Sequence, residues 1–126
     1  MIYGIGTDIV AVARMQTLWR AHAERGMEKI LAPDERSDCL AAPDPGRFMA
    51  KRFAAKEALG KALGTGIRSP VLLPKIGVTH DSTGKPEFVY FDELAAHIAQ
   101  NKLHAHLSLS DEDAFVVAFV IVEQMQ

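Results

Sequence analysis

The sequence RFMAKRFAAKEALGKALG at residues 47–64 sets the architecture of this chain. Drawn as a helix, it has an apolar side of the kind that packs on a core, formed by Phe48, Ala55, Leu59 and Ala62. The opposite side gathers Phe53, Glu57, Gly60, Lys61 and Gly64. A carboxylate and an ammonium one turn apart, beside two glycines, suit a negatively charged ligand that comes close to the backbone. This side of the helix therefore predicts an anion site with a metal ion next to Glu57.

Shorter elements are predicted on both sides of this helix. Strands are expected at residues 2–10, 75–80, 86–91, 104–110 and 115–123, and further helices at residues 11–24, from residue 33, and at 92–101. Gly26 is expected to end the first helix, and Asp92 to cap the last one. The strand at 115–123 is apolar on both faces, which places it centrally in a sheet. The predicted fold class is α+β, with an antiparallel or mixed sheet, one long helix and shorter helices.

Length and composition set broad bounds on function. A chain of 126 residues is expected to form one domain, spanning residues 1–126. Its formal net charge of −2 gives no sign of a nucleic-acid partner. Cys39 is the only cysteine, so no disulfide can form within the chain. The start does not resemble a signal peptide, and the longest apolar run is about half of what spans a bilayer. We expect a cytoplasmic domain that binds no membrane.

The first strand carries an acidic residue beside two glycines. Side chains alternate along a strand, so Gly4, Gly6 and Asp8 share one face, which would leave open space next to the carboxylate. The commoner role for such an aspartate is to cap the following helix, with the glycines forming a bulge. A dinucleotide-binding fingerprint is rejected, because Ile9 occupies the position of its third glycine.

Glu57 and Lys61 also have an ordinary explanation. A Glu–Lys pair at this spacing stabilises an exposed helix by a few tenths of a kcal/mol and is common. Gly60 argues for a ligand instead, since glycine within a helix costs about 1 kcal/mol relative to alanine. Close approach of a ligand to the backbone is one reason to keep it.

The strand at residues 104–110 places two histidines and two serines on one face. Zinc binding by His104 and His106 would need a third ligand, and none has suitable local spacing. A solvated strand face is the simplest interpretation. Alternatively, one histidine meets a phosphate while the serines donate hydrogen bonds to it.

Taken in order, these pieces resemble the small bacterial 4′-phosphopantetheinyl transferases, the holo-[acyl-carrier-protein] synthases. The resemblance covers the whole chain and is carried by MIYGIGTDIV at 1–10, RFAAKEA at 52–58, Lys61, GTGI at 64–67, GKP at 84–86 and HLS at 106–108. Members of this family transfer 4′-phosphopantetheine from coenzyme A to a serine of an acyl carrier protein in fatty acid biosynthesis. Adenosine 3′,5′-bisphosphate is the other product.

The resemblance implies a role for each matching residue. Asp8 and Glu57 would bind Mg²⁺ at the pyrophosphate of coenzyme A, and Lys61 would neutralise charge on a phosphate. Residues expected at the 3′-phosphate are Arg52 and His106. Residues expected to line the nucleotide cleft are Gly64, Lys85, Pro86 and Ser108. Arg14, and less strongly Arg20, would face the acidic carrier protein.

The resemblance also implies a homotrimer with sites at the subunit interfaces. One departure is residues 44–47, DPGR, where relatives often carry more basic residues, so contacts from this loop to coenzyme A are in doubt. The hypothesis for the general base is Glu57 itself or a metal-bound water that it orients. Two other classes of function stay open: another Mg²⁺-dependent phosphate-ester or nucleotide enzyme, and a non-catalytic module that binds an acidic partner.

Overall fold

Strands from both ends of the chain form the main sheet. A computed structural model describes residues 1–126. The elements in chain order are β1 (Ile2–Ala11), α1 (Val12–Ile30), the 3₁₀ helix η1 (Pro33–Glu35), α2 (Arg36–Ala41), α3 (Pro45–Leu63), the 3₁₀ helix η2 (Leu73–Lys75), β2 (Ile76–His80), β3 (Pro86–Tyr90), α4 (Asp92–Gln100), β4 (Leu103–Asp111) and β5 (Phe115–Gln124).

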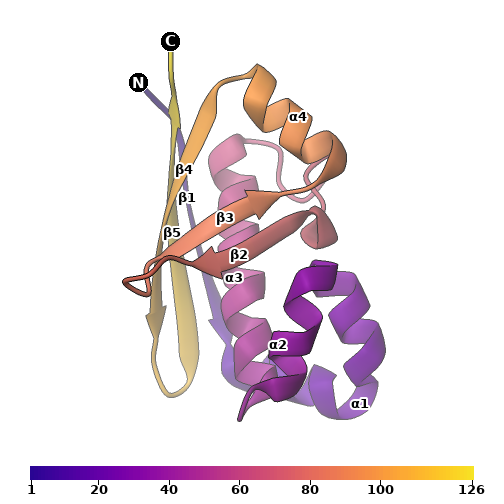
Figure 1. The fold of residues 1–126 in the computed structure, drawn as a ribbon. Helices are drawn as coiled ribbons and strands as arrows, with labels where there is room; N and C mark the ends of the chain where they lie inside the picture. The colour runs from indigo at the N-terminus through magenta and orange to yellow at the C-terminus, as the bar shows by residue number, and fades with distance from the viewer.

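The main sheet is antiparallel, with strand order β1-β5-β4. The doubly apolar β5 is central, as its sequence predicts, and β2 and β3 form a separate antiparallel hairpin. In Figure 1 the main sheet is seen nearly edge-on, and α1, α2, α3 and α4 all lie on the same side of it. The predicted α+β class with antiparallel sheets is therefore confirmed, and the opposite face of the main sheet has no helix over it.

The first helix is longer than its sequence indicates. Gly26 does not end it, because α1 continues to Ile30 with a kink at His22, whose backbone leaves the helical region. Gly26 is buried, and a Cβ there would lie 3.2 Å from Met49 Cε, so packing against α3 accounts for this glycine. As a result α1 and α3 both contain 19 residues, although only α1 is interrupted by a kink, and the expectation of a single long helix is not confirmed.

The two strand glycines let β1 and α3 pack backbone against backbone. Added Cβ atoms at Gly4 and Gly6 would clash with the carbonyl oxygens of Ala62 and Ala58. The prediction of open space beside Asp8 is therefore wrong, because α3 fills it. The register of β1 on β5 also shifts between Ile2 and Gly4, as the bulge interpretation expects.

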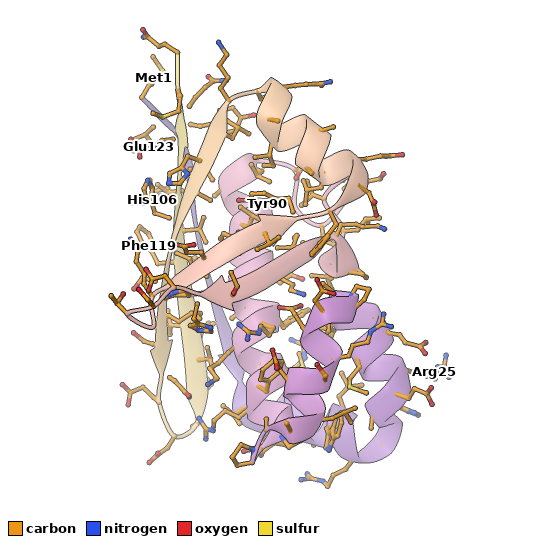
Figure 2. All side chains as sticks on the ribbon, in the orientation of Figure 1. Met1, Arg25, Tyr90, His106, Phe119 and Glu123 are labelled. Carbon is orange, nitrogen blue, oxygen red and sulfur yellow. The ribbon has the colours of Figure 1, made fainter.

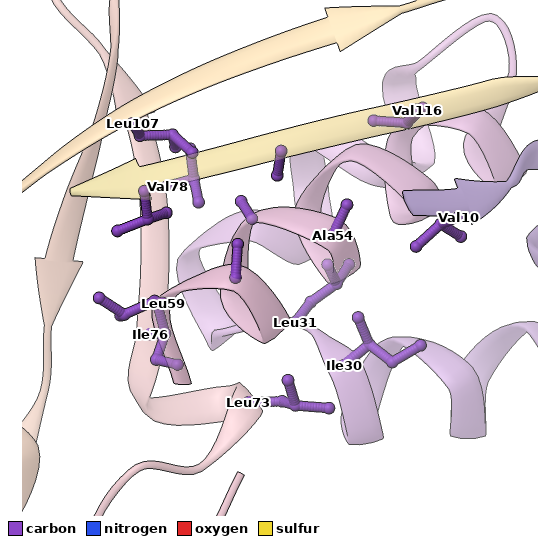
Figure 3. Close-up of a cluster of buried hydrophobic side chains, with 14 of the residues drawn as sticks. Val10, Ile30, Leu31, Ala54, Leu59, Leu73, Ile76, Val78, Leu107 and Val116 are labelled. Atoms are coloured by element: carbon purple, nitrogen blue, oxygen red, sulfur yellow. The ribbon is translucent and has the colours of Figure 1, made fainter. Parts of the chain in front are cut away.

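The core surrounds α3. Ala55, Leu59 and Ala62 are buried as predicted, whereas Phe48 is only half-buried at the edge of the core. Figure 3 shows Leu59 and Ala54 of this helix among side chains from the sheet, the β2–β3 hairpin and α1. None of the helices combines the length and the apolar character that crossing a bilayer would need.

The last helix begins without the predicted cap. Asp92 is its first residue and makes no capping hydrogen bond. Instead its backbone has a φ of 55°, and its carboxylate pairs with Lys75 Nζ at 2.5 Å. This ion pair attaches the start of α4 to η2.

Candidate active site

Two of the three side chains predicted to act together, Asp8 and Lys61, are in contact where β1 packs on α3, and the third, Glu57, is close enough to feel the charge of both. Asp8 lies on the inner face of β1, and Lys61 Nζ donates hydrogen bonds to Asp8 Oδ1 (3.1 Å) and to the carbonyl oxygen of Thr7 (2.9 Å). Glu57 lies one turn before Lys61 on α3. Asp8 does not cap α1, because the residue before that helix is Ala11 and no side chain caps it. The capping interpretation of Asp8 is therefore wrong.

The surroundings of Glu57 disfavour its charged form. Partial burial raises the pKa of Glu57 above its ordinary value, and the nearby Asp8 carboxylate raises it further, against the opposing effects of Lys61 and Arg14. Two carboxylates that repel each other are suited to a divalent cation. Their hard oxygen atoms fit Mg²⁺, which takes one or two protein carboxylates and keeps several waters. No three His, Cys, Asp or Glu side chains cluster as a metal site, so these residues could supply only part of a coordination shell.

The glycines at the end of α3 allow close packing of the following loop and a left-handed backbone conformation. Gly66 donates a hydrogen bond from its backbone N–H to the carbonyl oxygen of Gly60 (3.0 Å), and a Cβ at Gly60 would lie 3.0 Å from the carbonyl carbon of Gly66. The loop that folds back over Gly60 leaves no room for a side chain, which explains a glycine within this helix. A ligand that approaches the backbone is therefore not needed to explain it. Gly64 ends α3 in the left-handed conformation (φ 81°), as glycine readily does.

A groove runs between α1 and α3 and reaches Glu57. Its volume is about 870 Å³. Met15, Leu18 and Phe53 make its lining apolar, and Arg14, Arg25 and Lys29 add positive charge. The Arg14 guanidinium lies 5.4 Å from the centre of the Phe53 ring. The groove therefore combines an apolar lining with basic groups beside the acidic cluster.

Only one of the two basic residues predicted to face a partner lines this groove. Arg14 does so, whereas Arg20 is exposed elsewhere on α1. The sequence argument missed Arg25 and Lys29, because the predicted helix stopped at residue 24, before both of them. Extending the helical periodicity to Ile30 would have placed them on the same side as Arg14. Figure 2 shows Arg25 on the side of α1 that faces away from the main sheet.

A second cavity, of about 170 Å³, lies between β3 and β4. It brings together Lys85, Pro86 and His106, three of the residues predicted to bind nucleotide. His106 Nε2 lies 2.5 Å from Glu123 Oε1, and this hydrogen bond lowers the pKa of Glu123. Figure 2 shows His106, Glu123 and Phe119 together on the uncovered face of the sheet. Ser108 follows on the same face, outside the cavity.

Arg52 lies apart from both groups. It is buried, with its Nε 3.4 Å from Glu35 Oε2 and its guanidinium 4.5 Å from the centre of the Phe48 ring. Burial lowers its pKa. Five helical positions separate it from Glu57, which turns the two side chains about 140° apart around α3. Within one chain, the structure therefore does not bring Arg52 to His106.

The loop at residues 44–47 is occupied by internal contacts. Asp44 caps α3 by accepting a hydrogen bond from the Arg47 backbone (3.1 Å), and Arg47 Nη1 binds Asp111 Oδ1 (2.6 Å) in the β4–β5 turn. Further bonds reach the carbonyl oxygens of Glu112 and Asp113. This loop fastens α3 to the end of the main sheet.

The predicted site residues thus form two groups that a single chain keeps apart. Asp8, with Glu57 and Lys61, lies at the β1 edge on the inner face, whereas His106 lies on the outer face of β4. The central strand β5 separates β1 from β4. Within one chain the two groups therefore face opposite sides of the main sheet.

Comparison with known proteins shows the family of this chain. A model of the 4′-phosphopantetheinyl transferase superfamily matches residues 4–120. Holo-[acyl-carrier-protein] synthase of Dechloromonas aromatica is 56% identical over 123 residues, 98% of each chain. The crystal structure of the synthase from Neisseria meningitidis has a TM-score of 0.93 and 45% identity, covering 98% of this chain and 100% of that one. A synthase from Bacillus anthracis, solved in complex with CoA (3′,5′-ADP), has a TM-score of 0.83 and 35% identity, covering 99% of both chains.

Proposed function

Because this chain belongs to the 4′-phosphopantetheinyl transferase superfamily, among the holo-[acyl-carrier-protein] synthases, we propose that it converts apo-acyl carrier protein to the holo form. The serine oxygen of the carrier attacks the phosphorus that bears pantetheine, and the bond to the bridging oxygen of the pyrophosphate breaks. Adenosine 3′,5′-bisphosphate leaves with that oxygen. The convergence of Asp8, Glu57 and Lys61 is the observation that supports this chemistry best.

Asp8 and Glu57 would hold Mg²⁺ at the pyrophosphate. When bound, the cation would stabilise negative charge on the phosphate oxygens as a Lewis acid. Lys61 is half-exposed, and its ammonium can turn from Asp8 toward a phosphate and neutralise charge on the leaving group. The raised pKa of Glu57 also suits a group that accepts the serine proton.

The groove between α1 and α3 is the proposed docking place of the carrier. It ends at Glu57, so a serine presented there would reach the reacting phosphate. Its basic residues, Arg14, Arg25 and Lys29, would attract an acidic protein, and its apolar lining would take an apolar side chain beside the serine.

The nucleotide end of coenzyme A would lie against the second group, from a neighbouring copy. Lys85, Pro86 and His106 line one cavity, and Ser108 lies near it on β4. Gly64 would border the same nucleotide from the copy that holds Lys61. Arg52 is left out of this set, because the structure buries it beside Glu35.

A homotrimer would assemble these sites. The uncovered sheet face exposes the apolar side chains Tyr3, Ile5, Ile9, Phe115 and Phe119. Repeated head-to-tail contact, with the β4 edge of one copy on the β1 edge of the next, closes into a ring and places one complete site at each interface.

Intact-mass measurement of an apo carrier incubated with coenzyme A tests the proposal. A mass gain equal to phosphopantetheine, dependent on Mg²⁺ and lost in Asp8→Asn, is expected. Release of the bisphosphate without a carrier would show a hydrolase instead. Carrier binding that is unaffected by Asp8→Asn, with no mass gain, would show a non-catalytic module.

A further inference from the structure

A buried ion pair lies beside the candidate active site and takes no part in the chemistry proposed above. Lys56 directly precedes Glu57, and its side chain is completely buried. Its Nζ donates hydrogen bonds to Glu35 Oε1 (2.6 Å) and to the carbonyl oxygens of Ile30 (2.7 Å) and Leu73 (3.2 Å). All three ammonium protons are therefore bound, each by a different segment of the chain.

Glu35 adds further hydrogen bonds to those of Lys56. Its Oε1 also accepts a hydrogen bond from the Ala32 backbone N–H (2.9 Å), and its Oε2 accepts one from the Val78 backbone N–H (3.0 Å). The end of α1, η1, η2 and β2 are thus all linked to one position on α3.

Folding alone does not require a charged pair here. Burial lowers the pKa of Lys56 to about 8 even with Glu35 beside it, so the cost of removing the ammonium from water is only partly offset. Buried ion pairs can often be replaced by apolar side chains of similar volume with no loss of stability. An apolar residue in place of Lys56 would lack only its directed hydrogen bonds, because Glu35 would still pair with Arg52.

Those hydrogen bonds reach the walls of the groove. Ile30 and Leu73, whose carbonyls bind Lys56, both line the groove, and so does Glu57, the next residue along α3. We propose that Lys56 and Glu35 are positioning residues for the transfer reaction, because they hold the end of α1 and η2 at a fixed separation from α3 and so set the shape of the carrier groove. This inference rests on the proposed function.

The test replaces Lys56 alone, as Lys56→Met, which removes its three hydrogen bonds and leaves Glu35 paired with the buried Arg52. Unfolding in urea checks that the variant is folded before its kinetics are measured. Its kcat/KM for the apo carrier should fall at least tenfold, while its KM for coenzyme A stays within twofold. Lys75→Met with Asp92→Asn removes an exposed ion pair that does not line the groove, and serves as the control with unchanged kinetics.

Hydrogen exchange gives a readout that does not depend on activity. In Lys56→Met, backbone amides at residues 27–31, 73 and 75 should exchange at least tenfold faster than in the wild type, with β5 unchanged. If Lys56→Met does not fold, Lys56→Gln keeps a hydrogen-bond donor at this position, and the same direction of change is expected.

Two results would overturn the proposal. One is a folded Lys56→Met variant with the wild-type kcat/KM for the carrier, and the other is unchanged exchange in both segments; either would make the pair merely structural. Failure of the proposed function would look different, since the wild type itself would then transfer nothing to the carrier.

Discussion

Glu57 is held in an environment that opposes its charge. It is partly buried next to Asp8, and both effects raise its pKa in the folded protein. A carboxyl with a raised folded-state pKa stabilises the fold most below its unfolded pKa, and that stability is lost as pH rises through the folded pKa. Charged Glu57 therefore costs folding free energy near neutral pH, as expected for a residue kept for its chemistry.

Glu57→Gln should separate these effects. We predict that turnover falls at least tenfold (about 1.4 kcal/mol of barrier), while the free energy of unfolding at pH 7 stays equal or rises. The difference in stability should vanish below about pH 4, where the unfolded carboxyl is protonated as well. Urea titrations at the two pH values and a carrier-modification assay measure both quantities. A variant that keeps more than about a tenth of wild-type kcat would remove Glu57 from the mechanism.

At the scale of elements, the contact between β1 and α3 builds the catalytic cluster. Asp8 and Lys61 meet because Gly4 and Gly6 let the two backbones approach. The sequence predicts the strand, the helix and the shared face of Asp8 with the glycines. It does not reveal what the glycines face, because Ala58 and Ala62 lie more than fifty positions away and only the tertiary structure brings them together.

Gly6→Ala tests whether the glycine serves packing or ligand access. Its new Cβ would meet the Ala58 carbonyl oxygen, so we expect a loss of about 1–3 kcal/mol in the free energy of unfolding. Thr79→Ala, at an exposed position on β2, is the control and should change stability by less than about 0.5 kcal/mol. Unfolding in urea distinguishes the two explanations, since unchanged stability with lost activity would favour ligand access.

The helix α1 should determine how the carrier binds. Arg25→Ala should weaken carrier binding and reduce its dependence on salt, whereas Arg20→Ala should have little effect, because only Arg25 lines the groove. Calorimetric titrations at low and high salt would measure this. Equal effects of the two substitutions, or wild-type binding that is insensitive to salt, would count against docking in the groove.

For the whole molecule, the uncovered sheet face is the dominant surface feature. The central position of β5 was predictable, because both of its faces are apolar although only one packs on α3. The groove between α1 and α3 was not predictable, because it depends on α1 continuing beyond Gly26. Glycine usually tends to end a helix, but here Gly26 lies inside α1 and packs against Met49 of α3. The separation of the site residues into two groups was not predictable either. It follows from the strand order β1-β5-β4, which the sequence alone does not reveal.

Substitution on the uncovered face of the main sheet should dissociate the proposed homotrimer into monomers. Ile5→Lys places a charge where neighbouring copies would pack, so we expect sedimentation as a monomer together with loss of transfer activity. Leu40→Lys, at an exposed apolar position on α2, is the matched control and should keep both the assembly and the activity. An active monomeric Ile5→Lys variant would show that one chain holds a complete site.

Subunit complementation tests the shared site most directly. One variant carries Asp8→Asn, and the other carries Lys85→Ala with His106→Ala; each should be inactive alone. Trimers that contain both, isolated through two different affinity tags, should have one restored site in three and therefore about a third of the wild-type transfer rate. A mixed assembly no more active than its separate components would contradict a site built from two copies of this chain.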